Sequence, residues 1–385
     1  MYIDLTVWLR LLRHVHRETH GARAYLRRMA LFALGSLYLI ASNLFLLADH
    51  LVFSQFRQMR IHNGPVFVIG NMRSGTTRMH RLLCDDRDHT TSLALWEILF
   101  PSLIQRRLLM GLAWLDRVLL RGFFARRLTA AQDAKFGKAR RMHHWDVLAP
   151  EEDEWVFFHC LRSASLTIFF PDLAEFLDLS WTDEQPERTR RRMMEFYDGI
   201  IRRQLALHGE DRRYVVKSPT FTQKLRTLVA HYPEAKFIYL VRNPHEMMHS
   251  GISLVFKTWR ALGCSAALLE RSTRVLGETT LRIYEYAEEV MPTLRPDQIQ
   301  VVEYDELLAH PARVMRRLYQ TFGWKLDAFY SAHLDAEEAR ARGYRSEHRY
   351  SRTELSPPDA EIERRLSFLF DRYGWQRHAG ESTAP

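Results

Sequence analysis

Short hydrophobic runs and longer amphipathic stretches alternate along most of the chain. Residues 66–69, 214–217 and 236–241 are rich in β-branched and aromatic side chains, as strands buried on both faces are. Stretches with helical spacing separate or follow these runs, among them residues 188–208 and 359–373. Strands and helices that alternate at these lengths predict an α/β fold with a parallel sheet and helical additions.

A different hydrophobic run lies near the N-terminus. Residues 30–48 are nearly all apolar, and the arginine-rich segment 1–28 precedes them. The run is long enough to cross a bilayer, and the arginines would keep the N-terminus in the cytoplasm. A span would then export the rest of the chain. A hydrophobic helix on the inner membrane face, or one packed on the protein's own core, avoids that outcome. We expect a basic N-terminal segment with this helix (1–60), one main domain (61–376) and a disordered tail (377–385).

The first short run ends in a glycine-bounded loop. Gly70, four residues, Gly75 and then Thr76-Thr77 have the spacing of a Walker A loop, but Thr76 stands where that loop has lysine. Arg73 supplies a positive charge from inside the loop, and the free amides at the start of the next helix favour an anion. The pattern predicts a P-loop-like anion site that does not serve the γ-phosphate of ATP. In a purely structural interpretation, the glycines only make a tight turn.

Two further cations stand where short runs end. Lys217 ends the run 214–217, and Arg242 follows the run 236–241. Ligands of parallel sheets bind outside the carboxyl ends of the strands. Gly70, Lys217 and Arg242 are therefore expected to converge on one polyanion site. Taken singly, Lys217 could be a surface lysine and Arg242 part of a structural ion pair.

Composition narrows the function only slightly. The net charge of +9 fits an anionic ligand or an anionic surface, although the arginines are spread along the whole chain. The three cysteines are Cys84, Cys160 and Cys264, so widely separated that they indicate a reducing compartment and offer no disulfide or metal framework.

The sequence from Arg73 to Thr77 (Arg-Ser-Gly-Thr-Thr) after a buried strand resembles the 5′-phosphosulfate loop of sulfotransferases that use 3′-phosphoadenosine 5′-phosphosulfate (PAPS). Asn71-Met72 and Arg78 depart from the family pattern without removing an anion ligand. The resemblance extends over about residues 65–375. It implies a P-loop-like sulfotransferase fold and a set of PAPS-binding residues: Arg73, Ser74, Gly75, Thr76, Thr77, Arg242, Ser250 and Tyr304.

Within that resemblance, Arg242 and Ser250 match the 3′-phosphate segment, and Lys217 matches a catalytic lysine near the transferred sulfuryl group. Glu97 lies where one branch of the family keeps a glutamate base, and His143 or His144 is the reserve candidate. The apolar setting of Glu97 predicts either a core residue paired with an arginine or a carboxyl with a raised pKa. We expect no metal, because PAPS is already activated and adjacent histidines usually point apart.

The sequence therefore predicts a cytoplasmic PAPS-dependent sulfotransferase, with contact to the inner membrane face left open and no nucleic-acid partner. Its acceptor is a hydroxyl or amine that the sequence does not identify, with a lean toward a lipid. Two rivals remain: an atypical P-loop kinase, and a non-catalytic nucleotide- or polyanion-binding protein. A kinase is disfavoured by Thr76 in the lysine position, and a non-catalytic protein by the presence of candidate bases.

Overall fold

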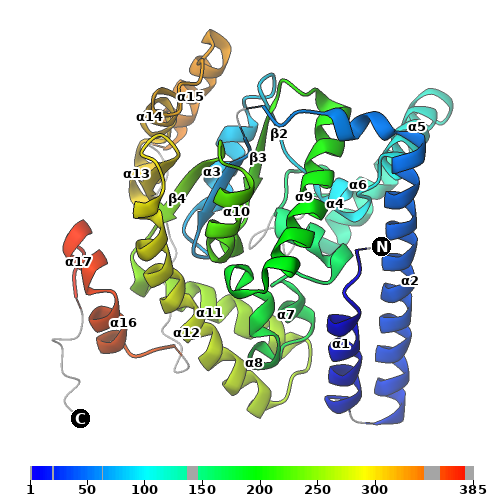
Figure 1. The fold of residues 1–385 in the computed structure, drawn as a ribbon, viewed down its shortest axis with the longest axis horizontal. Helices are drawn as coiled ribbons and strands as arrows, with labels where there is room; N and C mark the ends of the chain where they lie inside the picture. The colour runs from blue at the N-terminus through cyan, green and yellow to red at the C-terminus, as the bar shows by residue number, and fades with distance from the viewer. Residues whose placement is uncertain (1, 20, 63, 137–145, 342–355, 378–385) are drawn as a thin grey trace. The chain divides into compact units, whose positions relative to one another are not determined.

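The computed structural model describes residues 2–19, 21–62, 64–136, 146–341 and 356–377 (Figure 1). The chain forms two compact units that interleave in sequence. Unit 1 contains Met1–His62, Thr91–Arg162 and Arg192–Tyr214, and unit 2 contains Asn63–Thr90, Ser163–Arg191 and Val215–Pro385. Both units therefore draw on distant parts of the sequence.

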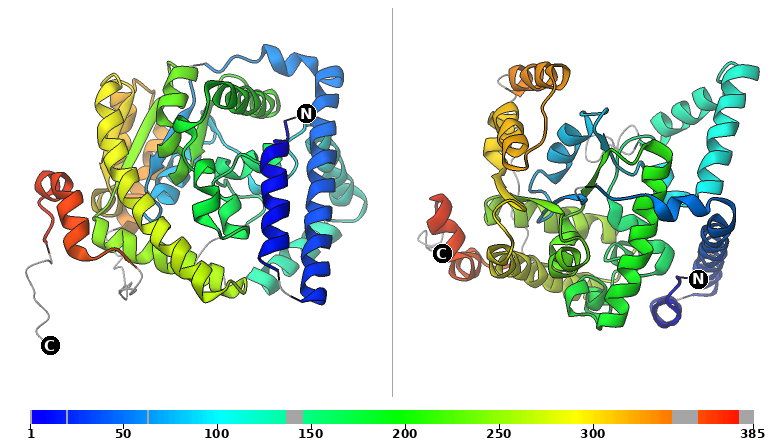
Figure 2. Two further views of the ribbon diagram at one scale, coloured as in Figure 1. Left: turned by 60° about the horizontal axis from the view of Figure 1, so that its bottom comes forward. Right: turned by 45° about the horizontal axis from the view of Figure 1, so that its top comes forward.

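Unit 1 is helical. Its elements are α1 (Leu5–Arg17), α2 (Ala22–Val52), α4 (Leu95–Leu99), α5 (Leu103–Leu119), α6 (Phe123–Phe136), the 3-10 helix η3 (Asp153–Cys160) and most of α9 (Glu187–His208). α1 and α2 run side by side (Figures 1 and 2), and the Trp8 indole N–H donates to Ser36 Oγ at 2.8 Å between them. The apolar run expected at residues 30–48 is thus the middle of a longer helix.

Unit 2 contains the sheet. Its strands are β1 (Val66–Gly70), β2 (Thr90–Thr91), β3 (Arg213–Lys217), β4 (Lys236–Val241) and β5 (Ile299–Glu303), and the chain passes between units within β2 and β3. The strand order is β2-β3-β1-β4-β5, and β1 pairs in parallel with β3 and β4, as β4 does with β5. The predicted α/β fold with a parallel sheet is confirmed.

The helices of unit 2 follow the strands in the alternation that the sequence predicts. They are α3 (Thr76–Cys84), α7 (Leu166–Phe169), α8 (Leu173–Phe176), α10 (Leu225–His231), α11 (Pro244–Ala261), α12 (Ala266–Val290), α13 (Tyr304–Ala309), α14 (Pro311–Thr321), α15 (Ala328–Ala341), α16 (Asp359–Arg365) and α17 (Ser367–Tyr373). The stretch 359–373, read as one helix from the sequence, is two short helices.

Both faces of the central strands β3, β1 and β4 are buried, as their uninterrupted hydrophobic runs require. Val66, Val68 and Ile238 point to one face, where they pack with side chains of α3, α14 and α15 in a single core cluster. Phe67 and Phe237 point to the other face and stack with ring centroids 5.3 Å apart. This alternation follows from the two-residue period of a strand.

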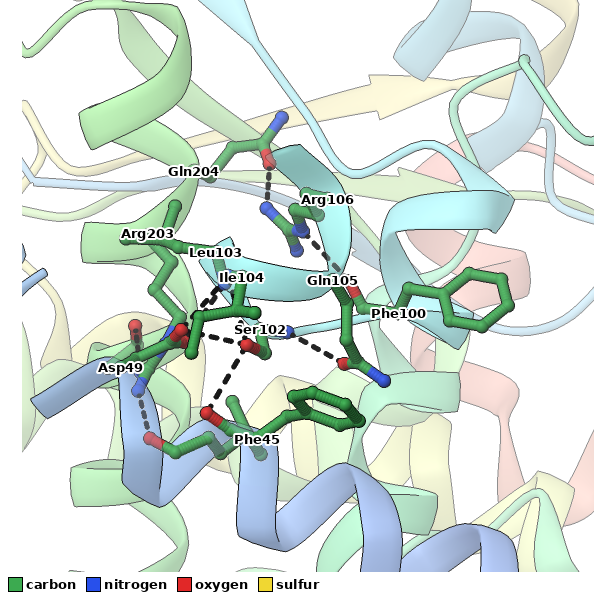
Figure 3. A network of polar contacts seen from close by, with 12 residues as sticks. Phe45, Asp49, Phe100, Ser102, Leu103, Ile104, Gln105, Arg106, Arg203 and Gln204 are labelled. Atoms are coloured by element: carbon green, nitrogen blue, oxygen red, sulfur yellow. Dashed lines mark hydrogen bonds and ion pairs between the residues drawn. The ribbon is translucent and has the colours of Figure 1, made fainter. Parts of the chain in front are cut away.

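In unit 1, α2 is anchored by a buried carboxylate. Asp49 is fully buried and its Oδ2 accepts a 2.7 Å hydrogen bond from Arg203 Nε of α9. It also accepts hydrogen bonds from Ser102 Oγ at 2.7 Å, the Leu103 N–H at 2.9 Å and the Ile104 N–H at 3.1 Å, at the start of α5 (Figure 3). This side of α2 therefore packs on the protein's own core, one of the two alternatives that the sequence left open.

The opposite side of α2 is exposed. Leu34, Leu37 and Leu44 are 63%, 62% and 57% exposed. Among the described residues, α2 is the one helix long and apolar enough to cross a membrane, with mean hydropathy 2.0 in its most apolar window. α2 therefore combines a buried ion pair at one end with bare leucines along the other side.

Candidate functional site

The loop between β1 and α3 has a backbone that only glycine adopts easily at two of its positions. Gly70 has φ 143° and Gly75 φ 91°, and Arg73 between them is also left-handed, with φ 64°. A Cβ at Gly70 would lie against the Leu240 carbonyl oxygen, and one at Gly75 would stand 2.8 Å from the Tyr304 ring. The predicted tight loop is present, and it leads into the amide-bearing N-terminus of α3.

Four of the predicted nucleotide-binding residues meet at this loop. Arg73 Nε donates to Ser250 Oγ at 3.1 Å, and Arg242 Nη1 donates to the Arg73 carbonyl oxygen at 3.0 Å. The Arg242 guanidinium lies 4.1 Å from the centre of the Tyr304 ring, a cation–π contact. Residues from the loop, the end of β4, α11 and α13 thus form one contiguous cluster. The strand-end argument predicts Arg242 in it, and the family resemblance predicts Ser250 and Tyr304.

Lys217 reaches the same loop from β3. Val68 of β1 is paired with Lys217, which places the lysine beside the start of α3. Lys217 Nζ lies 3.5 Å from Thr77 Oγ1, and the lysine is only 2% exposed. Burial, and secondly the charge of Lys217, lower the pKa of neighbouring His80 to about 3. Lys217 is therefore no surface lysine, and His80 stays neutral beside it.

The loop hydroxyls do not share one orientation. Ser74 is fully buried and its Oγ donates to the Asn71 carbonyl oxygen at 2.5 Å, so this hydroxyl closes the loop on itself. Thr76 is 4% exposed, whereas Thr77 is half-buried beside Lys217. Of the three predicted hydroxyl ligands, Thr77 is the one whose contact joins a second strand end to the loop.

Arg242 also has the ion pair that the alternative interpretation expected. Its Nη2 donates to Glu246 Oε2 at 2.8 Å, one turn along α11. Glu246 is absent from the sequence prediction, although its i,i+4 spacing from Arg242 is a visible signal. Thr222 was also missed: its Oγ1 accepts from the Gly70 N–H at 3.1 Å, and only the tertiary fold brings these residues together.

Glu97, the predicted base, belongs to unit 1. It is 3% exposed in α4, where its Oε2 accepts from the Ala94 N–H at 2.8 Å. Two α9 side chains reach it: His208 Nε2 lies 2.9 Å from Oε1, and Gln204 Nε2 donates to Oε2 at 3.2 Å. Arg106 of α5 donates to the Glu97 carbonyl oxygen at 3.0 Å and to Gln204 Oε1 at 2.7 Å, the latter drawn in Figure 3.

These contacts set the charge of Glu97. Burial alone would raise the pKa of Glu97, but the His208 hydrogen bond and the Arg106 charge together hold it below its usual range. The raised pKa allowed for on sequence grounds is therefore not found; the carboxylate pairs with His208, whereas Arg106 acts on it through its charge and bonds to the Glu97 carbonyl oxygen. Glu97 is an ionised carboxylate at neutral pH, with a histidine beside it. His143 and His144, the reserve candidates, lie outside the described residues.

Comparison with known proteins shows which proteins the chain is similar to. A model of the sulfotransferase family matches residues 65–328, more than half of the sequence. The omega-hydroxy-beta-dihydromenaquinone-9 sulfotransferase Stf3 of Mycobacterium tuberculosis, like its counterpart in Mycobacterium bovis, is 26% identical over 391 aligned positions, covering 98% of this chain and 91% of the relative.

Two solved structures share the fold. Sulfotransferase STF9 from Mycobacterium avium superposes with TM-score 0.68 at 16% identity, covering 98% of each chain. Sulfotransferase STF1 from Mycobacterium tuberculosis superposes with TM-score 0.63 at 21% identity, covering 89% of this chain and 86% of that one. The structural similarity extends beyond the glycine-bounded loop to most of the chain.

Proposed function

The chain belongs to the sulfotransferase family, and from that premise we propose that it moves a sulfuryl group from PAPS to a hydroxyl or amine acceptor. The observation that carries the proposal is the cluster of Arg73, Arg242, Ser250 and Tyr304 around a glycine-bounded loop. Such a cluster offers amides and guanidinium groups to an anion with two charged ends. Residues 61–376 are the proposed catalytic domain.

The donor-binding roles that we propose are those that the family resemblance implies. The α3 amides with Arg73, Ser74, Gly75, Thr76 and Thr77 hold the 5′-phosphosulfate. Arg242 and Ser250 bind the 3′-phosphate, and Tyr304 lies beside the nucleotide. Lys217, next to Thr77, neutralises the charge that grows on the leaving phosphate. Ser74 contributes through its backbone, because its hydroxyl is bonded to Asn71.

The transfer is a substitution at sulfur. The acceptor oxygen or nitrogen forms a bond to sulfur while the bond from sulfur to the 5′-phosphate oxygen breaks, and adenosine 3′,5′-bisphosphate leaves. Glu97 takes the acceptor proton, and its low pKa means that it is ionised before the acceptor arrives. The His208 contact orients the carboxylate. The transfer itself needs no metal, because the sulfuryl group is already activated.

We propose a lipid-like acceptor used at the cytoplasmic face of a membrane. The mycobacterial relative is named for a hydroxylated menaquinone, which is a lipid. In unit 1, apolar side chains of α2, α5 and α6 are exposed, among them Leu37, Trp114 and Phe124 at 62%, 60% and 62%. Exposed apolar residues interspersed with arginines are typical of helices that lie in a membrane interface.

A ligand screen tests the donor. Adenosine 3′,5′-bisphosphate should raise the unfolding temperature of the full chain, and ATP–Mg²⁺ and heparin should raise it less. Stabilisation of about 2.7 kcal/mol is expected at one hundred times the dissociation constant. A larger shift with ATP–Mg²⁺ would favour the kinase alternative, and a shift with heparin alone would favour a non-catalytic polyanion-binding protein.

Vesicle binding tests the membrane contact. Deleting residues 1–50 would remove Asp49 from Arg203 and damage unit 1, so the sharper change is Leu34, Leu37 and Leu44 to serine. This variant should lose co-sedimentation with anionic vesicles and keep its unfolding temperature. Equal sedimentation of the variant and the parent chain would contradict membrane contact through α2.

A further inference from the structure

Three side chains of metal-ligand type converge where α16 packs on α11. His245 and His249 lie one turn apart on α11, and Asp359 is the first residue of α16. His245 Nδ1 is 3.4 Å from Asp359 Oδ1, and His249 Nε2 is 3.6 Å from the same oxygen. The three donor atoms all lie within 4.8 Å of one another. We propose that this group binds a divalent transition-metal ion, Zn²⁺ foremost, which fastens α16 to α11.

A carboxylate behind the cluster supports this assignment. Glu363, one turn along α16, has its Oε1 3.1 Å from His245 Nε2. A proton on Nε2, donated to Glu363, leaves the Nδ1 lone pair directed at the other two ligands. Metal-binding histidines almost always donate their second ring N–H to such a group. His245 and Glu363 are 5% and 6% exposed, so the arrangement is built into the packed interior.

The ligand types and their spacing favour zinc. Two imidazoles and one carboxylate suit Zn²⁺, whereas Mg²⁺ and Ca²⁺ prefer oxygen ligands throughout. Bonds of about 2.0–2.1 Å in a tetrahedral site put neighbouring donor atoms about 3.3–3.4 Å apart. The separations of 3.4 and 3.6 Å come close to that spacing before any ion draws the ligands together.

The two histidines belong to the sequence His245-Glu246-Met-Met-His249, which has the spacing of the zinc-peptidase helix. In those enzymes the glutamate is a general base. Here Glu246 Oε2 accepts from Arg242 at 2.8 Å, so this carboxylate is neutralised by an arginine outside the ion cluster. The geometry therefore assigns a structural role to the ion rather than hydrolysis.

The ion would fasten α11, a helix that contributes to the proposed nucleotide site. α11 begins just after Arg242, and Ser250 directly follows His249. Arg365 of α16 also pairs with Glu285 of α12 at 2.7 Å, so the ion adds to an existing attachment. Tighter binding of adenosine 3′,5′-bisphosphate to the metal-loaded protein rests on the proposed function, whereas metal binding does not.

Cobalt titration of the chelator-stripped full chain, without nucleotide, tests the site. One equivalent of Co²⁺ should give the strong visible absorption of a tetrahedral site, and one equivalent of Zn²⁺ should abolish it. Zn²⁺ should also raise the unfolding temperature. An absent or weak octahedral spectrum in the parent chain would overturn the proposal and leave a plain histidine–carboxylate ion-pair cluster, with the sulfotransferase assignment untouched.

Variants locate the ion. Asp359→Asn keeps the side-chain volume and should lose the tetrahedral spectrum, and His249→Ala should do the same. Glu363→Gln should weaken Zn²⁺ binding by about 10–100-fold, as loss of an outer carboxylate does. The matched control is His89→Ala, which alters a second group of ligand types formed with Asp86 and Asp327. Binding that survives Asp359→Asn but not His89→Ala would refute the assignment.

Discussion

The glycine-bounded loop and the surroundings of Glu97 are built in opposite ways. The loop is made by consecutive residues, Gly70 to Thr77, whose backbone angles and amides come from the local chain. The Glu97 carboxylate is held by Gln204 and His208, which follow it by 107 and 111 residues. A site built from the backbone of consecutive residues can be predicted from the sequence. When a site is built by packing, the sequence points to one of its residues and not to the distant partners.

The two regions also differ in charge. Three cations, Arg73, Lys217 and Arg242, accompany the loop, as a site for a polyanion requires. Around Glu97 one carboxylate is offset by Arg106 and His208, which keep it ionised despite burial. The first region gathers positive charge for an anion, and the second holds one negative charge, on the carboxylate that we propose as the base. The following experiments test this contrast, from the largest expected effect to the smallest.

The largest effect is expected for Glu97→Gln. The glutamine keeps a carbonyl oxygen for the Ala94 N–H but cannot take a proton, so kcat should fall about 10²–10⁴-fold. Affinity for adenosine 3′,5′-bisphosphate, measured by calorimetry, should be unchanged. Unimpaired turnover would transfer the role of base to a histidine. Weakened nucleotide binding would mean that Glu97 also contributes to donor binding, against the division of roles between the two regions.

Arg203→Met tests the packing of unit 1. It leaves Asp49 buried without its ion-pair partner, so the free energy of unfolding should fall by about 3–5 kcal/mol in urea denaturation. Arg274→Met is the control, because its pair with Glu270 is exposed and should contribute about 1 kcal/mol or less. Similar losses in the two variants would show that the Asp49 anchor has no special importance.

Arg242→Ala tests the loop cluster. It removes the proposed charged donor to the 3′-phosphate and the bond to the Arg73 carbonyl. Binding of adenosine 3′,5′-bisphosphate should weaken by about 1.5–3 kcal/mol, or roughly 10–150-fold. Glu246→Gln is the comparison, since it alters the other partner of Arg242 and should change binding far less. Unchanged calorimetric binding in Arg242→Ala would contradict its 3′-phosphate role.

The smallest effect is expected in a pH series that compares one buried histidine in each unit. Burial is the main cause that lowers the pKa of His159 in unit 1 to about 4 and that of His80 in unit 2 to about 3. Below about pH 6.5 these two histidines bind protons in the unfolded chain but not in the folded protein. The free energy of unfolding therefore falls as the pH falls. Each histidine should contribute up to about 1.4 kcal/mol per pH unit.

This pH dependence is measured as the free energy of unfolding between pH 7 and pH 5. His159→Gln should flatten the slope in that interval, and His80→Gln should flatten it to a similar extent. The parent chain is the reference. Parallel slopes in all three proteins would mean that neither buried histidine stays neutral in the folded state.

The sequence by itself determined the parallel α/β fold, the loop from Gly70 to Gly75 and the strand-end positions of Lys217 and Arg242. These features depend on hydrophobic period, glycine backbone freedom and chain direction, all of which are local. The family resemblance added Ser250 and Tyr304, and the structure brings both to the loop.

Only the tertiary structure decided the charge of Glu97, the anchoring of α2 through Asp49, and the meeting of His245 and His249 with Asp359. The apolar run of α2 predicts a hydrophobic helix, but not that one carboxylate in it pairs with an arginine of α9. Likewise, the apolar neighbours of Glu97 in the sequence left open either a raised pKa or an arginine partner, whereas side chains from α5 and α9 lower the pKa. Burial and pairing belong to residues far apart in the chain, and packing alone brings these residues within a few ångströms of each other.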